Sequence, residues 1–357
     1  MSTSSAASTA LRVGLIGYGT AGRFFHAPLL TTTPGLELTA IVTSDPERRA
    51  EAESAYPGVR IVETAQDLWS LELDLVVVAS PNKTHVPLAE GAITAGVAVV
   101  VDKPLAVTSA DARKLVAFAE RRGKLLSVFQ NRRWDGDFRT VQQLLAEGRL
   151  GTPLRFESRF ERWRPQLKGG WRELGDRSQG SGLLYDLGSH LVDQALTLFG
   201  PVEHVYAEAD IRRAGATADD DTFIALTHAS GTRSHLWASA TAASLGPRFR
   251  VLGSQGAYVT YGLDGQEAEL RAGRTPRDRR FGVTPAARYG KLGTEDAFEK
   301  YPTLPGRYTD YYAAIERALR GEGPVPVDPH DAIAALDVIE AARISADEGR
   351  VVTVSKP

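Results

Sequence analysis

The sequence predicts an α/β protein in two parts, a doubly wound parallel sheet followed by an α+β unit with a large, open, mostly antiparallel sheet. In the first 130 residues, short strands without polar alternation are separated by helical segments, which is typical of a parallel sheet covered on both faces. Beyond residue 132, longer segments alternate between polar and apolar residues, which indicates a sheet with one packed face and one free face.

The first part divides into six expected strands and the helical segments between them. Apolar runs predict strands at 12–16, 38–42, 60–62, 73–79, 97–101 and 125–129. The intervening segments predict a helix that ends near residue 30 and helices at 46–56, 64–69, 85–95 and 109–122. Because strands and helices alternate throughout, a parallel sheet with helices on both faces follows.

The second part has a different pattern of apolar and polar residues. Period-two alternation predicts strands at 154–163, 202–211, 221–227, 233–241, 248–252 and 257–261. Helical periodicity predicts helices at 138–145, 184–198, 308–320 and 329–347. The stretch 271–301, rich in Arg, Gly and Pro, is expected to be a long irregular loop whose role the sequence does not indicate.

Composition limits the possible partners and location. The 357 residues suit two domains of ~100–200 residues each, and 43% hydrophobic with 24% charged residues is ordinary for a soluble protein. A net charge of −2 without a Lys/Arg block argues against nucleic acid or a membrane as partner. Zero cysteines exclude disulfides and thiolate metal sites. With no secretory signal and no apolar run of ~20 residues, we expect a cytoplasmic protein.

A glycine motif follows the first expected strand and opens the first helix, the position of a dinucleotide-binding turn. The first glycine forms the tight turn, the second lets a pyrophosphate approach the backbone, and the third lets helix pack on strand. Backbone amides at the helix start then bind the phosphates. A glycine turn without a ligand is the alternative, and the βαβ context favours the dinucleotide. The expected binding residues are Gly17, Tyr18, Gly19, Thr20, Ala21 and Gly22.

The pattern of apolar and polar residues changes near residue 130, and this change sets the expected domain boundaries. Residues 1–10, small and polar, are expected to be a disordered lead. Residues 11–131 are expected to form a Rossmann-type dinucleotide-binding domain. Residues 132–357 are then expected to form an α+β domain, with one face of its sheet free to meet solvent, a partner or a substrate.

The end of the second strand bears on the choice between NAD and NADP. An acidic residue there would bind the ribose diol of NAD, but Asp45 precedes Pro46, which predicts a helix N-cap instead. Thr43, Ser44 and Arg48 remain to line this site, and a guanidinium suits a 2′-phosphate. NADP is therefore favoured. NAD remains possible, because the alternative interpretation is that Arg48 and its neighbour are solvated charges on the helix surface.

Polar residues also follow the next two long strands. Ligands of doubly wound sheets bind at the carboxyl ends of strands, so these residues are placed beside the nicotinamide. The alternative is a plain turn that caps the following helix, and His85 is expected to be structural. Lys103 directly follows a buried apolar strand. A lysine that served only as a surface charge would not be expected at this position. The residues concerned are Ser80, Pro81, Asn82, His85, Asp102 and Lys103.

One helix carries a carboxylate and an imidazole one turn apart. Asp186, His190, Asp193 and Thr197 fall on one stripe, separate from an apolar face. An imidazole beside a carboxylate suits proton transfer near neutral pH. The alternative is a solvated face with a capping aspartate. No metal is required, because no His/Asp/Glu cluster elsewhere has ligand spacing.

Taken together, four motifs resemble the Gfo/Idh/MocA family of sugar and polyol oxidoreductases over the chain from about residue 11. They are Gly17-x-Gly19-x-x-Gly22, Ser80-Pro81-Asn82-x-x-His85, Asp102-Lys103-Pro104 and Asp186-x-x-x-His190. Segments 14–30, 129–135 and 184–196 look most similar to its NADP-dependent scyllo-inositol dehydrogenase branch. The family's usual Glu-Lys-Pro is Asp-Lys-Pro here, and its usual triple glycine is Gly-Ser-Gly at 180–182, so no reacting group is lost.

The resemblance implies hydride transfer between a nicotinamide and a secondary alcohol or ketone of a cyclic polyol or sugar. His190 would be the general base, Asp186 would bind the substrate or orient His190, and Lys103 would stabilise charge on the reacting oxygen. It also implies a homodimer or homotetramer joined through the C-terminal sheet. The alternatives are an NADPH-dependent keto-sugar reductase and a non-catalytic dinucleotide sensor. Further residues either contact cofactor or substrate or belong to the scaffold: Asn131, Arg132, Trp163, Arg164 and Trp171.

Overall fold

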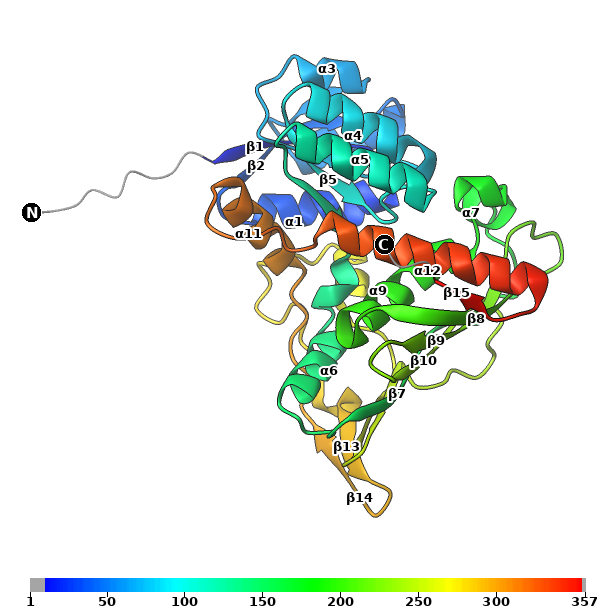
Figure 1. Ribbon diagram of the computed structural model, residues 1–357. Helices are drawn as coiled ribbons and strands as arrows, with labels where there is room; N and C mark the ends of the chain where they lie inside the picture. The colour runs from blue at the N-terminus through cyan, green and yellow to red at the C-terminus, as the bar shows by residue number, and fades with distance from the viewer. Residues whose placement is uncertain (1–9, 355–357) are drawn as a thin grey trace, which may run out of the picture.

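The computed structural model describes residues 10–354. The expected lead at 1–10 therefore lies, apart from its last residue, outside the described residues, as do the last three residues of the chain. The described part contains a six-stranded sheet and a nine-stranded sheet. In Figure 1 the first sheet and its helices lie at the top and the second sheet below, with the red helix α12 (Pro329–Glu348) between them. The predicted fold class is confirmed.

The first sheet is entirely parallel, with strand order β3-β2-β1-β4-β5-β6. β4 is buried throughout and β5 everywhere except at its last residue, because helices cover both faces of the sheet, and this explains why these strands lack polar alternation. The order reverses between β1 and β4, and that reversal marks the ligand crevice of a doubly wound sheet. The strands are β1 (Leu11–Ile16), β2 (Leu36–Val42), β3 (Arg60–Val62), β4 (Leu75–Val78), β5 (Ala98–Asp102) and β6 (Leu126–Phe129).

The helices of this part begin where local sequence signals place them. Asp45 caps α2 by accepting from the amides of Glu47 and Arg48, with Pro46 in the first turn. The first turn after the glycine loop is a π-helix, η1, that continues into α1. The helical segments are η1 (Gly22–His26), α1 (Ala27–Thr32), α2 (Pro46–Ala55), α3 (Ala65–Trp69), η2 (Asn82–Thr84), α4 (His85–Thr94) and α5 (Ser109–Arg121).

The second sheet is mixed and mostly antiparallel, with order β14-β13-β12-β11-β7-β10-β9-β8-β15. β7 and β10 run parallel, and the other pairs are antiparallel. Burial alternates along β9 and β10, since α9 and α12 pack on one face. The strands are β7 (Pro153–Glu161), β8 (Val202–Asp210), β9 (Asp221–His228), β10 (Arg233–Ser239), β11 (Phe249–Gly253), β12 (Ala257–Thr260), β13 (Gly290–Thr294), β14 (Ala297–Tyr301) and β15 (Val352–Thr353).

The prediction of a single helix over 184–198 is wrong in one respect. The helix is broken at Leu187, whose φ and ψ are −104° and −34°. Two helices result, so the polar positions do not form one continuous stripe. The remaining helical segments are η3 (Asn131–Trp134), α6 (Gly136–Ala146), α7 (Trp171–Leu174), η4 (Arg177–Gln179), α8 (Leu183–Asp186), α9 (Gly188–Phe199), α10 (Gln266–Arg271), η5 (Ala286–Arg288) and α11 (Tyr308–Leu319).

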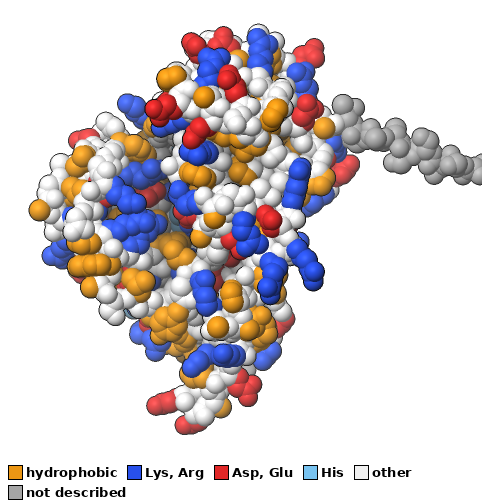
Figure 2. All heavy atoms as spheres, turned by 180° about the vertical axis from the view of Figure 1, so that it is seen from behind, with side chains coloured by type: hydrophobic (Ala, Val, Ile, Leu, Met, Phe, Trp, Pro, Cys, Tyr) orange, Lys and Arg blue, Asp and Glu red, His pale blue; other side chains and the backbone are white. Residues whose placement is uncertain are grey.

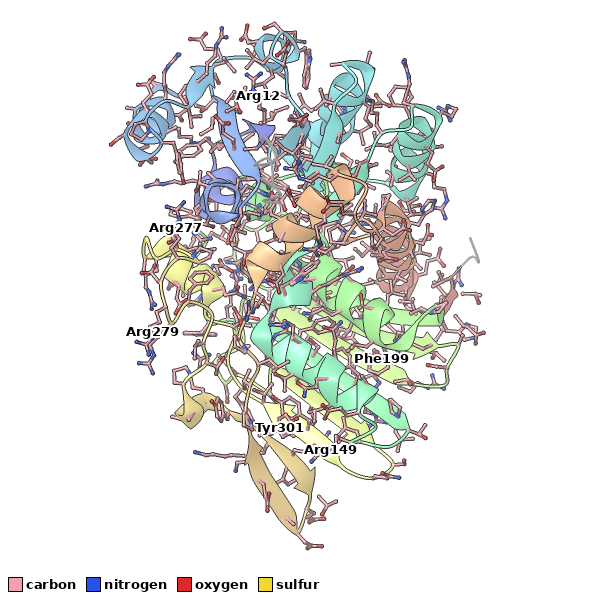
Figure 3. The ribbon with its side chains drawn as sticks, turned by 90° about the vertical axis from the view of Figure 1, so that its left-hand side faces the viewer. Arg12, Arg149, Phe199, Arg277, Arg279 and Tyr301 are labelled. Atoms are coloured by element: carbon pink, nitrogen blue, oxygen red, sulfur yellow. The ribbon has the colours of Figure 1, made fainter. Side chains whose placement is uncertain are left out.

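The stretch 271–301 is not one irregular loop, which corrects the expectation. Its second half forms the β13–β14 hairpin at the lower end of the molecule in Figure 1. Most of β14 is exposed, so its sequence lacks the apolar alternation by which a half-buried strand is recognised. Its first half reaches the other part of the molecule, where the Arg277 guanidinium donates to the carbonyl of Thr31 over 2.9 Å. Figure 3 shows Arg277 beside the first part and Arg279 pointing outward.

Candidate active site

The glycine loop has the geometry of a phosphate cradle. Gly17 has φ +97°, and a Cβ there would lie 2.6 Å from the carbonyl oxygen of Ala79. A Cβ on Gly22 would collide with the carbonyl of Gly17. Above Gly19 the nearest atom to a Cβ is Nη1 of Arg48, at 3.9 Å. The protein therefore fills the space at the first and third glycines and leaves it open at the second, as a bound pyrophosphate requires.

The other residues of the glycine loop differ in their exposure. The Tyr18 side chain is buried, with its ring edge-on to that of Tyr56 at 6.5 Å. Thr20 is exposed and Ala21 half-buried. Amides at the start of a helix carry partial positive charge, which suits phosphate oxygens.

At the end of β2, Asp45 is engaged in capping α2. Its Oδ1 accepts from the amides of Glu47 (3.0 Å) and Arg48 (3.1 Å). Arg49 is engaged as well, with Glu53, Glu63 and a main-chain carbonyl. The Arg48 side chain is about half exposed and lies near Gly19, with its Nε 3.6 Å from the carboxylate of Asp45. Thr43 is buried and Ser44 exposed beside it. Arg48 is thus the arginine of α2 best placed for a phosphate.

The segment after β4 connects the two parts of the molecule. Asn82 is buried, and its amide donates to the carbonyl of Gly180 over 3.3 Å. His85 lies 2.7 Å from the carbonyl of Pro104 and 2.9 Å from that of Ser80, so it ties the end of β4 to the end of β5. Burial lowers the pKa of His85. This geometry fits the structural role expected for His85.

Lys103, at the end of β5, meets Asp186, at the end of α8. The Lys103 Nζ lies 2.9 Å from Asp186 Oδ1 and 2.6 Å from the Asp186 carbonyl oxygen. Arg172 of α7 approaches the same Oδ1 to 3.3 Å. Burial acts to raise the pKa of Asp186, but the two cations outweigh it and hold that pKa well below its usual range. Asp186 is therefore a carboxylate that anchors the ammonium.

His190 lies in the first turn of α9 and is 5% exposed. Its Nδ1 is buried, and no hydrogen-bond partner is found for it among residues 10–354. Burial, together with the positive charge of Lys103, lowers its pKa well below the usual value, although Asp186 acts in the opposite direction. Its ring lies 6.2 Å from that of Phe160 on β7. A neutral imidazole in this position can accept a proton.

Two residues of the expected polar stripe serve the scaffold, which corrects that part of the prediction. Asp193 is 1% exposed, and its carboxylate pairs with Arg133 at 2.6 Å. Thr197 donates to the main-chain carbonyl of Asp193 over 2.7 Å. The stripe is therefore divided, because Asp186 faces Lys103 while Asp193 faces the turn after β6.

Asp102 contacts Lys103, the next residue in the chain, through a hydrogen bond to its backbone amide. Its Oδ1 accepts from the Lys103 amide over 2.8 Å, and its Oδ2 is 3.9 Å from Nε2 of buried His26. Burial acts to raise the pKa of Asp102, but His26, Lys103 and His85 together lower it. His26 in turn contacts the Tyr312 hydroxyl at 2.6 Å.

The remaining predicted residues are distributed unevenly around this cluster. Arg132 is buried and already bonded to Tyr308 (3.1 Å) and Glu267 (2.5 Å). Asn131 is buried beside it in η3. Trp163 is 58% exposed and forms a bridge with Thr241 at the end of β7. Arg164 is exposed further along the same segment, and Trp171 begins α7 next to Arg172.

Three residues near the cluster escaped the sequence reasoning: Arg162, Arg172 and Glu267. The alternation along 160–164 could have indicated that Arg162 faces the site. The position of Arg172 directly after Trp171, a candidate site residue, could have indicated Arg172 as well. Glu267 lies on α10, a helix that no sequence signal predicted.

A hollow of about 1490 Å³ lies elsewhere. It opens between α5, α9, α12 and β8, where Arg113, Leu196, Val202 and Val338 are among its lining residues. The site is therefore defined by its polar cluster rather than by volume. Within the described part, no group of three or more His, Asp or Glu is arranged to hold a metal ion.

Two family models match this chain. The Rossmann-fold, NAD-binding model of the Gfo/Idh/MocA oxidoreductases matches residues 11–130, and their C-terminal alpha/beta model matches residues 142–354. The chain therefore belongs to the Gfo/Idh/MocA oxidoreductase family. It is an oxidoreductase with an NAD(P)-binding Rossmann fold, as the motifs predicted. Among residues 10–354, no helix is long and apolar enough to cross a membrane.

Individual relatives are similar along nearly their whole length. The uncharacterized oxidoreductase YdgJ of Escherichia coli is 46% identical, covering 92% of this chain and 94% of its own. The NADP-dependent scyllo-inositol 2-dehydrogenase IolW of Bacillus subtilis is 34% identical, covering 96% and 95%. The structure of the oxidoreductase YPO2259 from Yersinia pestis superposes with a TM-score of 0.91 at 40% identity, covering 99% and 100%.

Proposed function

We propose that this protein transfers hydride between the nicotinamide of NADP(H) and a secondary alcohol or ketone of a cyclic polyol or sugar. The observation that carries the proposal is the cluster of Lys103, Asp186 and His190 at the carboxyl edge of the parallel sheet. The similarity to IolW, whose name states an NADP-dependent inositol dehydrogenase, supports the substrate class and the cofactor.

Lys103 would hold the reacting oxygen. An ammonium has three donors, and two of them are directed to the side chain and main chain of Asp186. The third is available to a substrate hydroxyl or carbonyl, where a positive charge stabilises developing negative charge. Asp186 fixes the ammonium in this position.

His190 would accept the hydroxyl proton in oxidation and return it in reduction. Its lowered pKa keeps the imidazole neutral at neutral pH, which is the form that a general base requires. The bound nicotinamide supplies the hydride chemistry itself. The protein supplies position and electrostatics.

Cofactor binding would rest on the glycine loop and on the ends of β2, β4 and β5. Arg48, with Ser44 beside it, would bind the 2′-phosphate that distinguishes NADP from NAD. Residues 11–131 would form the cofactor domain and residues 132–357 the substrate domain. The open face of the nine-stranded sheet would join copies into a dimer or tetramer, and the cytoplasm would be the place of action.

The test is a panel of polyols and sugars, assayed with NAD and with NADP, on the wild type and two variants. Lys103→Ala and His190→Ala should each lower kcat by roughly 10²–10⁴-fold, the usual worth of proton transfer and charge stabilisation. Cofactor affinity, measured by nucleotide fluorescence, should change little, since neither residue lies in the glycine loop.

Matched controls exist on the surface. Lys114→Ala removes a lysine whose side chain is 75% exposed, and His330→Ala removes a histidine whose side chain is 59% exposed. Both should behave as wild type. Near-normal turnover by both site variants would refute the catalytic assignment. Binding of cofactor without turnover of any probe would favour the dinucleotide sensor.

A further inference from the structure

The end of β7 directs a row of side chains toward His190. Along extended backbone, residues two apart face the same side. Phe160 faces His190, with 6.2 Å between the ring centroids. Beyond the strand the backbone stays paired, since the Arg162 and Arg164 amides donate to the carbonyls of Ser239 and Ala240. Arg162 and Arg164 therefore continue the row that Phe160 begins.

Arg162 is a half-buried cation beside the site. Within residues 10–354, its guanidinium makes no hydrogen bond or ion pair, although the charges of Asp186, Glu267, Arg132 and Arg164 all act on it. Burial, helped by Arg164, lowers its pKa. A desolvated guanidinium without an anion is costly, so this position needs an explanation.

The nearby carboxylates are already engaged with other cations. Asp186 binds Lys103 at 2.9 Å and lies 3.3 Å from Arg172. Glu267 binds Arg132 at 2.5 Å and Arg271 at 3.1 Å. Each acid therefore has two basic partners.

Two further acids face these cations, since Asp135 lies 3.6 Å from Arg132 and Asp102 interacts with Lys103. Positive charge is still in excess once Arg162 and exposed Arg164 are added to Lys103, Arg132, Arg172 and Arg271. Figure 2 shows lysine and arginine side chains gathered on the walls of the hollow beside the lobe at the left, the side where α7 lies. A cleft lined by charge of one sign attracts a ligand of the opposite sign.

We infer that the substrate carries an anionic group, a carboxylate or a phosphate, which Arg162 binds with the help of Arg164. Guanidinium groups bind both anions through two parallel hydrogen bonds. The inference rests on the proposed function. The alcohol carbon would lie at Lys103 and His190, where hydride leaves to the nicotinamide and the hydroxyl proton to His190, while the anionic group takes no part in the chemistry.

The experiment compares neutral rings with their anionic counterparts. D-Glucose and scyllo-inositol are the neutral probes, D-glucuronate carries the carboxylate, and D-glucose 6-phosphate carries the phosphate. The wild type should show a kcat/KM at least tenfold higher for one anionic probe than for D-glucose, and which one identifies the anion. Raising the salt concentration should reduce this preference, because ions screen the attraction.

Arg162→Gln should raise KM for the preferred anionic probe at least tenfold and leave kcat on the neutral probes within about twofold. Arg155→Gln is the matched control, since Arg155 is exposed near the other end of β7. Calorimetry of each probe with the cofactor-loaded protein gives a readout independent of turnover. There, the anionic probe should bind the wild type more tightly than Arg162→Gln.

The outcomes separate the inference from the proposed function. Equal kcat/KM for neutral and anionic probes, unchanged in Arg162→Gln, would overturn the inference and leave the proposed function intact. Binding of an anionic probe through Arg162 without turnover would support the anion site and refute the proposed dehydrogenase. If no probe is turned over and no anionic probe binds, both are refuted.

Discussion

Replacing Asp186 by Asn tests how the negative charge of this carboxylate affects Lys103 and His190. The change keeps the shape of the side chain and the main-chain acceptor of Lys103, but it removes the negative charge 2.9 Å from the ammonium. A hydrogen bond to a charged group is worth about 1.5–3 kcal/mol. Because 1.4 kcal/mol is a factor of ten, kcat/KM should fall by roughly 10- to 100-fold.

The same variant should also change the pH profile. The profile of kcat/KM should rise with pH until His190 is neutral and then level off, with its acid limb below about pH 6.5 because the pKa of His190 is lowered. Asp186 acts to raise that pKa, since its negative charge stabilises the imidazolium. Without this charge the pKa falls further, so the acid limb should move to lower pH while the plateau drops.

The assay is initial-rate kinetics with saturating cofactor between pH 4.5 and 8, within the range where circular dichroism shows a folded protein. Asp347→Asn, which removes a 55% exposed carboxylate on α12, is the control for charge and should match the wild type. An acid limb that stays in place or moves to higher pH would show that Asp186 does not act on His190. A loss of cofactor affinity equal to the loss of kcat/KM would show that the variant acts through the fold.

Two further predictions concern the cofactor and the scaffold. Ser44→Asp combined with Arg48→Ala should shift the preference between NADP and NAD by at least tenfold toward NAD, about 1.4 kcal/mol, and a wild type that already prefers NAD would contradict the reasoning. Asp193→Ala should lower the free energy of unfolding in urea by about 3 kcal/mol or more, because it leaves Arg133 without its buried partner. Asp331→Ala, which removes the 47% exposed partner of Arg133, should cost at most ~1 kcal/mol, and equal losses for the two would rule out burial as the cause.

The first sheet could be predicted because each of its signals is local. A strand such as β4 is apolar at every position, and helix α2 begins at an Asp-Pro pair that caps it. Local signals require no knowledge of distant residues. The same holds for Gly17 and Gly22, whose neighbours in space follow from the strand–turn–helix geometry.

The errors occur where distant contacts determine the structure. The break at Leu187 separates α8 from α9, although the sequence continues the apolar periodicity through it. It lets Asp186 face Lys103, 83 residues away, while Asp193 faces Arg133. The β13–β14 hairpin is largely exposed, so burial left no pattern in its sequence.

The same contrast separates the two halves of the site. The proposed cofactor half comes from consecutive turns at one edge of a sheet, so its residues appear in the sequence as short motifs. The proposed substrate half would be assembled from β7, α7, α8–α9 and α10. There the roles of Arg162, Arg172 and Glu267 depend on the acids and bases beside them. Motifs can therefore identify the reaction class of such a chain, whereas the proposed preference for an anionic substrate rests on Arg162, whose surroundings become visible only in the folded structure. Arg162 is the position at which that distinction becomes measurable.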